Sequence, residues 1–221
     1  MRNIWRMGLA AAAAVALAMP AGAQVTFQTG NHPQPNEDNI LFDVGVNGPA
    51  NTVTGQVDHF SPMILVDFTS TGQLLTAPSS GQARVSGDNA DVSTAMTINL
   101  QDPTGTFADF ILNPINGSRG DLTVDATFVG TSSGTSSFTY TIANGNNFLT
   151  ITADAGFELT KLVLTPASGV TYSDLRQPRI SGVLIGGVPP TGGQVPEPGT
   201  WAMMAGMGVP LLGFVRRMRK S

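Results

Sequence analysis

The stretch Asp121-Leu122-Thr123-Val124-Asp125-Ala126-Thr127-Phe128 alternates polar and apolar side chains without a break. Successive side chains of a β-strand point to opposite faces, so this period of two puts all the apolar residues on one face. A strand of this kind covers a hydrophobic core with that face and meets water with the other. The stretch therefore predicts a half-buried strand within a sheet.

The same alternation recurs elsewhere in the chain. One parity holds Val92, Thr94, Met96, Ile98 and Leu100. A further strand is indicated by three apolar residues that alternate with serine and threonine, namely Phe138, Tyr140 and Ile142. Shorter apolar or threonine-rich segments predict strands over 24–28, 40–46, 51–57, 82–86 and 175–183.

Turn residues separate these segments at intervals of about 8 to 12 residues, which is the spacing of short antiparallel strands. Between the two ends of the chain, no window has the 3.6-residue apolar period of an amphipathic helix. The sequence therefore predicts an all-β domain, an antiparallel β-sandwich of the jelly-roll type.

Four segments carry more specific predictions. The apolar run 63–68 is short enough for a strand buried on both faces. The strand over 107–112 is expected to end at Asn113-Pro114, because proline has no N–H for the ladder. Asn144-Gly145 predicts a hairpin turn into a strand over 147–153. Over 157–164 the apolar parity changes, which indicates a β-bulge or a turn in and out of the core.

The N-terminus has the layout of a secretory signal peptide. Arg2 and Arg6 give a positive start, and the alanine-rich run 7–19 is apolar. Ala21-Gly22-Ala23 then offers the small residues of a cleavage site. We expect a signal helix and signal peptide over 1–23, export by the Sec machinery and a mature chain beginning at Gln24. The run is too short for the alternative, a first membrane helix.

The C-terminus combines three segments with different physical properties. Val195-Pro196-Glu197-Pro198 is held extended by its prolines, so the acid is displayed. The span from Trp201 to Val215 carries no charge and predicts a short transmembrane helix. It is followed by four cations, which mark the cytoplasmic side: Arg216, Arg217, Arg219 and Lys220. Including Thr200, the span is about 24 Å long as a helix, shorter than a bilayer core of about 30 Å.

This tail closely resembles the PEP-CTERM sorting signal of Gram-negative bacteria. The resemblance lies in the Val195–Thr200 motif, the glycine-containing apolar span and the basic end, and covers about the last tenth of the chain. It implies that the tail spans 195–221 and is read and cut by exosortase, an integral-membrane, transpeptidase-like enzyme. The inner membrane would then hold the chain only transiently, through its C-terminus, before processing.

Between the two signals we expect a β-sandwich ectodomain over 24–185 and a Gly/Pro linker over 186–194. The whole chain has 11 Lys and Arg residues and 15 Asp and Glu residues. The expected leader and tail contain six of the cations and one of the anions, Glu197. The domain between them therefore has five cations, 14 anions and a net charge of −9. An acidic domain of this kind is not expected to bind nucleic acid. The chain has no cysteine, which excludes disulfides and cysteine metal sites.

Oxygen-rich loops are the candidates for a metal. Extracellular sandwiches can hold calcium, which takes six to eight oxygen ligands. The weak candidates, from two loops, are Glu37, Asp38, Asp88 and Asp91. Acids of this kind also form turns and keep a surface soluble, so the default expectation is that the protein has no cofactor.

Other chemistry is less well supported. Gly130-Thr131-Ser132-Ser133-Gly134 matches the nucleophile elbow of serine hydrolases, but a strand follows it where the elbow needs a helix. A Ser/Thr/Gly hairpin loop is the preferred interpretation. His32 and His59 lack the spacing of a zinc site. The domain has no tryptophan, since Trp5 and Trp201 lie in the targeting segments, and this weakens a sugar-binding interpretation.

We therefore expect an exported, exosortase-sorted protein of the cell envelope or extracellular matrix. Its β-sandwich would be non-catalytic, and structural or adhesive in an exopolysaccharide biofilm. The alternatives are a module that binds carbohydrate, such as matrix polysaccharide, or calcium, and a secreted hydrolase, which needs two facing carboxylates.

Overall fold

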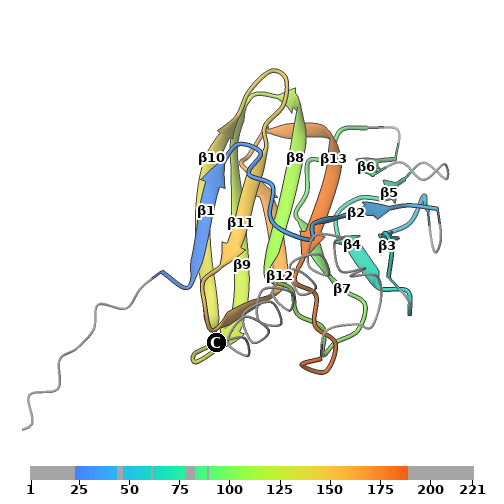
Figure 1. Ribbon diagram of the computed structural model, residues 1–221. Coiled ribbons are helices and arrows are strands. Elements are labelled where there is room, and N and C mark those ends of the chain that lie inside the picture. The colour runs from blue at the N-terminus through green and yellow to red at the C-terminus, as the bar shows by residue number, and fades with distance from the viewer. Residues whose placement is uncertain (1–22, 44–46, 61, 78–82, 89, 189–221) are drawn as a thin grey trace, which may run out of the picture.

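In this computed structural model, which describes residues 23–43, 47–60, 62–77, 83–88 and 90–188, the chain forms 13 β-strands (Figure 1). The described residues include no helix. The strands are β1 (Val25–Thr29), β2 (Asp38–Leu41), β3 (Thr52–Val57), β4 (Leu65–Ser70), β5 (Leu75–Thr76), β6 (Arg84–Gly87), β7 (Met96–Leu100), β8 (Asp109–Ser118), β9 (Gly120–Gly130), β10 (Gly134–Ile142), β11 (Leu149–Ala153), β12 (Phe157–Pro166) and β13 (Thr171–Ser181).

The strands form two layers, and their pairings within the described residues are antiparallel. The front sheet in Figure 1 runs β1-β11-β8-β13, and β13 continues to β6 and β5. The back sheet runs β3-β4-β7-β12-β9-β10. β2 pairs with β13 of the front sheet and β3 of the back sheet, so it joins the two layers into one hydrogen-bonded path.

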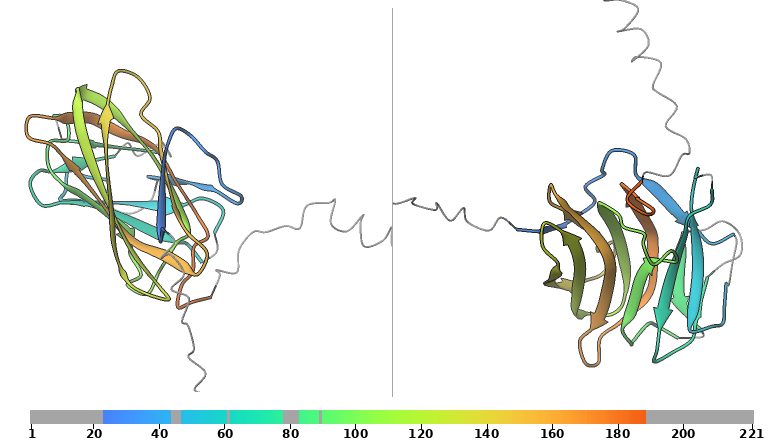
Figure 2. Two further views of the ribbon diagram at one scale, coloured as in Figure 1. Left: turned by 90° about the vertical axis from the view of Figure 1, so that its left-hand side faces the viewer. Right: turned by 90° about the horizontal axis from the view of Figure 1, so that it is seen from below.

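The two ends of this path, β1 and β10, nearly close on each other. Phe27 of β1 stacks on Phe138 of β10 with ring centroids 5.3 Å apart and an interplanar angle of 14°. The fold is therefore all-β and sandwich-like, close to a flattened barrel; Figure 2 shows it from the side and from below. The jelly-roll pattern of connections stays a prediction.

The alternating stretch behaves as the sequence predicts. Leu122, Val124, Ala126 and Phe128 of β9 are buried, and the polar residues between them are more exposed. The predicted alternation in β7 and in the segment 92–95 before it also holds, since Val92, Met96, Ile98 and Leu100 are all buried. The change of parity in β12 is a bulge, because the register with β9 shifts between Leu159 and Lys161.

The predicted hairpin at Asn144-Gly145 is wrong. β10 pairs with β9 in the back sheet, whereas β11 pairs with β1 and β8 in the front sheet. The segment 143–148 therefore crosses from one layer to the other. A turn motif fixes the local reversal of the chain, but burial decides which sheet receives the next strand.

Two further strand predictions need correction. β8 continues through Pro114 to Ser118, because β11 pairs only with residues 109–112 and leaves the region of Pro114 with a strand on one side. Proline is tolerated at such edge positions. The run 63–68 is not buried on both faces: Met63 is 53% exposed, and β4 alternates between buried and half-buried residues.

The predicted signal helix, most of the linker and the predicted membrane helix lie outside the described residues. Within the described part of the chain, no helix is long and apolar enough to span a membrane.

Candidate functional site

The outer face of the front sheet carries two arginines side by side. Val85 of β6 and Leu175 of β13 lie opposite each other and are fully buried in the core. Their neighbours Arg84 and Arg176, which also pair across these strands, therefore point to the opposite face. Like charges placed directly opposite on a sheet repel each other, so this pair requires a compensating group.

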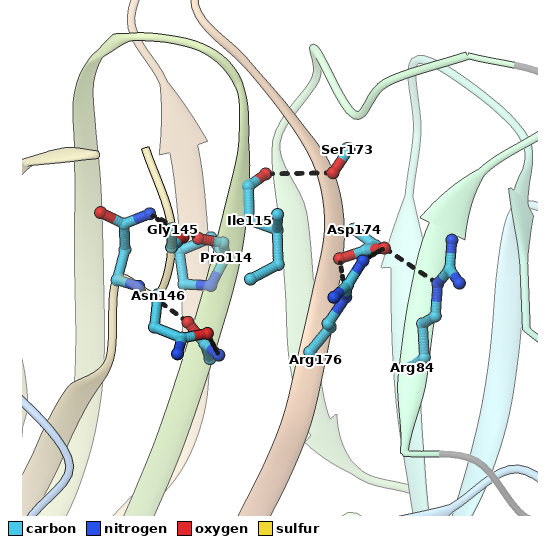
Figure 3. Close-up of polar contacts among 10 residues, drawn as sticks. Arg84, Pro114, Ile115, Gly145, Asn146, Ser173, Asp174 and Arg176 are labelled. Atoms are coloured by element: carbon cyan, nitrogen blue, oxygen red, sulfur yellow. Dashed lines mark hydrogen bonds and ion pairs between the residues drawn. The ribbon is translucent and has the colours of Figure 1, made fainter. Parts of the chain in front are cut away.

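Asp174 is that group. Arg176 donates from Nε to Asp174 Oδ1 at 2.8 Å and from its Nη2 to Oδ2 at 3.2 Å, and Arg84 Nε lies 2.9 Å from Oδ2. The Asp174 side chain is 1% exposed, whereas those of Arg84 and Arg176 are 43% and 49% exposed. Figure 3 shows the two guanidinium groups approaching the carboxylate from two sides. The cluster thus keeps a net charge of +1 in exposed donors.

Asparagines continue this face across β8. Asn113 of β8 is opposite Arg176 and donates to Asn146 Oδ1 at 3.1 Å. Asn147 donates its backbone N–H to Asn113 Oδ1 at 2.8 Å and its amide to the Pro114 carbonyl at 3.0 Å. Asn113 is buried and fixes the crossing segment. Asn146, which is labelled in Figure 3, is exposed. We call Arg84, Asp174, Arg176, Asn113 and Asn146 together the arginine face.

A third arginine lies further along β13. Arg179 Nε is 3.0 Å from Glu37 Oε1, in an ion pair without hydrogen-bond alignment. Its guanidinium also contacts Asn31 and lies 6.0 Å from the ring centroid of Phe148. These contacts hold the segment 30–37, which crosses in front of β11 and β8 to reach β2 (Figure 1). The side chains of Arg179 and Glu37 are only 18% and 8% exposed, so this pair is structural.

The calcium candidates are not brought together. Asp38 pairs with Ile180 of β13, whereas Asp91 Oδ2 accepts from Thr171 Oγ1 at 2.9 Å, near the other end of β13. Nine residues of a strand separate these points by roughly 30 Å. Asp88 directly follows β6. Within the described residues, no three His, Cys, Asp or Glu side chains converge as metal ligands.

The two histidines occupy loops. His32 Nε2 lies 3.1 Å from the Thr29 carbonyl. His59 Nδ1 lies 3.4 Å from Asp38 and 3.3 Å from Asp58. Burial raises the pKa of Asp38, and Asp58 raises it further, while His59 partly offsets both. These contacts fit local loop structure rather than a reacting centre.

One pair of acids interacts across the two layers. The pKa of Glu158 in β12 is raised by burial and, to a smaller extent, by the charge of Asp109 in β8. Asp109 accepts from Ser181 Oγ at 2.7 Å through Oδ2. Asp109 Oδ1 and Glu158 Oε2 are buried and have no hydrogen-bond partner. Two interacting carboxylates of this kind are what a hydrolase would need, but nothing in the described residues assigns this pair a substrate.

The Gly130–Gly134 segment is a tight loop between β9 and β10, because Gly134 already pairs with Phe128. It therefore lacks the strand-to-helix geometry of a nucleophile elbow, which confirms the hairpin loop predicted from the sequence.

Sequence reasoning missed the arginine face. Arg84, Asn113 and Asp174 lie far apart in the chain, and only the pairing of β13 with β6 and β8 brings them together. The one signal in the sequence is the scarcity of cations: three of the five in residues 24–195 are Arg84, Arg176 and Arg179 on the front sheet.

Of the predicted targeting residues, Ala23 and Gln24 lie within the described part. Ala23 is exposed, and Gln24 directly precedes β1 and accepts a hydrogen bond from the Asp154 N–H at 3.1 Å. A cut between them would leave the first strand intact, but cleavage here stays a prediction. Ala21 and the whole tail 195–221 lie outside the described residues.

Comparison with solved structures gives two distant similarities. A family 29 carbohydrate-binding module from Piromyces equi has 11% identity and a TM-score of 0.32, over 72% of this chain and 91% of the module. A family 11 carbohydrate-binding module from Clostridium thermocellum, in complex with a β-1,3-1,4-mixed-linked tetrasaccharide, has 8% identity and a TM-score of 0.28, over 75% and 93%. At these values neither supports an inference about a ligand. No curated protein matches the chain.

The tail gives the decisive match. Residues 194–220 match the family model of the PEP-CTERM protein-sorting motif. The matched range includes the Pro-Glu-Pro motif, the apolar span and the four terminal cations. This motif marks a protein for export and for processing by exosortase. The chain therefore carries a PEP-CTERM protein-sorting motif at residues 194–220.

Proposed function

We infer that this chain is a structural or adhesive protein of the cell envelope or extracellular matrix, with a non-catalytic β-sandwich domain. The observation that carries this proposal is the sorting motif over 194–220, which implies delivery to the cell surface. In this account a signal helix directs export and a short C-terminal helix holds the chain in the inner membrane until exosortase acts. Release from that helix would leave the domain in the exopolysaccharide of a biofilm.

The arginine face supports an adhesive role over a purely structural one. It combines half-exposed guanidinium groups with an exposed asparagine on a rigid sheet. Rigid polar groups bind a ligand without a large cost in side-chain entropy. A structural calcium ion at Glu37 and Asp38, or at Asp88 and Asp91, is a separate proposal that calorimetry with calcium alone would test.

The sorting proposal is tested by replacing the acid of the motif. Glu197→Gln removes its charge and keeps its shape. In the sequence Glu197 follows the last described strand, β13, so we expect impaired processing and mislocalisation with unchanged domain stability. Fractionation of the host and thermal unfolding measure the two effects. Asp43→Asn, an exposed acid of the domain, is the matched control. Normal processing of the Glu197 variant would contradict the proposal.

A further inference from the structure

The positive charge of the domain is concentrated on one sheet. Arg84, Arg176 and Arg179 lie on the front sheet, and their anionic partners there are Asp174 and Glu37. The remaining 12 of the 14 anions of residues 24–195 include acids on or beside the strands of the front sheet, namely Asp38, Asp88, Asp91 and Asp109. The cluster of Arg84, Asp174 and Arg176 therefore keeps a net charge of +1 on a domain that is acidic overall. At physiological ionic strength, charges further away than about 8 Å are largely screened, so a ligand at this face would respond mainly to the local charge.

The cluster contains one more arginine than is needed to neutralise Asp174. One arginine would balance the buried carboxylate, yet two are held against it. Each guanidinium has five N–H donors, and Arg176 directs two of them to Asp174. Both side chains remain nearly half exposed. Asp174 thus fixes two planar donor groups in place, which reduces the entropy lost when they bind an anion.

The neighbouring side chains indicate the kind of anion. Guanidinium groups bind carboxylates through paired, charge-assisted hydrogen bonds. Asn146 is exposed and accepts through its amide oxygen from Asn113, the residue opposite Arg176, so its NH2 group lies on the other arm of the amide. Amides of this kind donate to hydroxyl groups. A face that offers guanidinium donors and amide donors together matches a ligand that carries both carboxylates and hydroxyls.

The acidity of the rest of the domain limits the charge density of the ligand. A closely spaced polyanion such as a nucleic acid duplex, with one charge per about 1.7 Å of axis, would extend beyond the arginine face and meet the surrounding acids. A sugar chain with one carboxylate per residue at most carries neutral, hydroxyl-rich surface between its charges.

We propose that the arginine face binds the carboxylates of an acidic, uronate-containing polysaccharide through Arg84 and Arg176, with Asn146 contacting adjacent hydroxyls. This rests on the proposed function, since it names the matrix component that an adhesive domain would hold. Arg84 and Arg176 are the binding residues, and Asp174 is a positioning residue.

The test is calorimetric titration of the protein isolated from its host, at 0.15 M salt, with polygalacturonate as the probe. We expect binding that weakens by about tenfold or more when the polymer is carboxyl-reduced, because the charge-assisted bonds are lost. Arg84→Gln and Arg176→Gln should each weaken binding by a similar factor. Lys161→Gln, the same change on an exposed residue of β12 in the back sheet, should leave the affinity unchanged within about twofold.

Circular dichroism checks that each variant is folded. If a glutamine variant does not fold, Arg→Lys at the same position keeps the charge beside Asp174 but removes the paired N–H donors of the guanidinium. This variant should still weaken binding. The proposal is overturned if the reduced polymer binds equally well, or if folded arginine variants bind like the wild type. Equal binding of poly-L-glutamate would overturn the assignment to a sugar. Because the titration uses purified protein, its outcome is independent of whether the tail is processed.

Discussion

Asp174 combines three hydrogen bonds or ion contacts to two arginines with almost complete burial, so its removal affects both neighbours at once. Without the carboxylate, Arg84 and Arg176 would face each other as like charges across β6 and β13. Their exposure lets water replace part of what is lost. Asp174 thus holds both arginines on one face, and the second arginine leaves the cluster with a net charge of +1.

Asp174→Ala should therefore destabilise the fold by about 1–3 kcal/mol, measured by urea unfolding. Asp43→Ala, the loss of an exposed acid, should change the stability by less than about 0.5 kcal/mol. Equal effects of the two substitutions would show that the Asp174 contacts contribute nothing.

Glu158 gives a pH-dependent prediction. Its pKa is raised above the ordinary value of 4.5 by burial and by Asp109, so its charged form is disfavoured in the folded state. The resulting destabilisation is present above the raised pKa and disappears as the pH falls below 4.5.

Glu158→Gln should accordingly stabilise the protein at pH 7 by a few tenths of a kcal/mol, a small gain because Glu158 is partly exposed. The gain should shrink as the pH is lowered through the raised pKa, in thermal unfolding measured from pH 7 to pH 4. A loss of stability at pH 7, or a gain that does not depend on pH, would contradict this explanation.

The individual strands differ in how far the sequence could predict them. β9 and the bulge of β12 were predictable because the alternation of apolar residues is visible in a short stretch of sequence and corresponds directly to which side chains are buried. The hairpin at Asn144-Gly145 failed because a turn motif does not say which sheet the next strand joins. The predicted strand end at Pro114 was wrong because a strand can contain proline where it has a neighbouring strand on one side alone, and the sequence does not show where β11 stops pairing with β8. The arginine face could not be predicted, since pairings of β13 that are distant in sequence create it.

The stacking of Phe27 on Phe138 predicts how β1 is held. Among the described strands β1 pairs with β11 alone, so its second edge is secured by side-chain packing against β10. Phe138→Ala should lower the hydrogen-exchange protection of residues 25–29 more than that of β13. Phe157→Ala, which removes a ring packed on Phe128 between β12 and β9, is the matched control. Equal loss of protection at β1 in both variants would contradict a closing role for the stack.

The molecule as a whole is a nearly closed, acidic β-domain. An export signal is predicted before it, and a PEP-CTERM motif follows it. The motif was identifiable from sequence because its three segments are contiguous and each has a plain physical character. The domain's ligand was not, because the residues that would bind it become neighbours only after folding. The sorting motif and the arginine face can thus be tested independently of each other.

Intact mass spectrometry of the protein isolated from its host tests the central proposal, that the tail is a processed sorting signal, most directly. The predicted result is a chain that begins at Gln24 and ends near the Pro196–Pro198 motif, without the apolar span and basic end. A protein that reaches the cell surface with residues 201–221 still attached would contradict it.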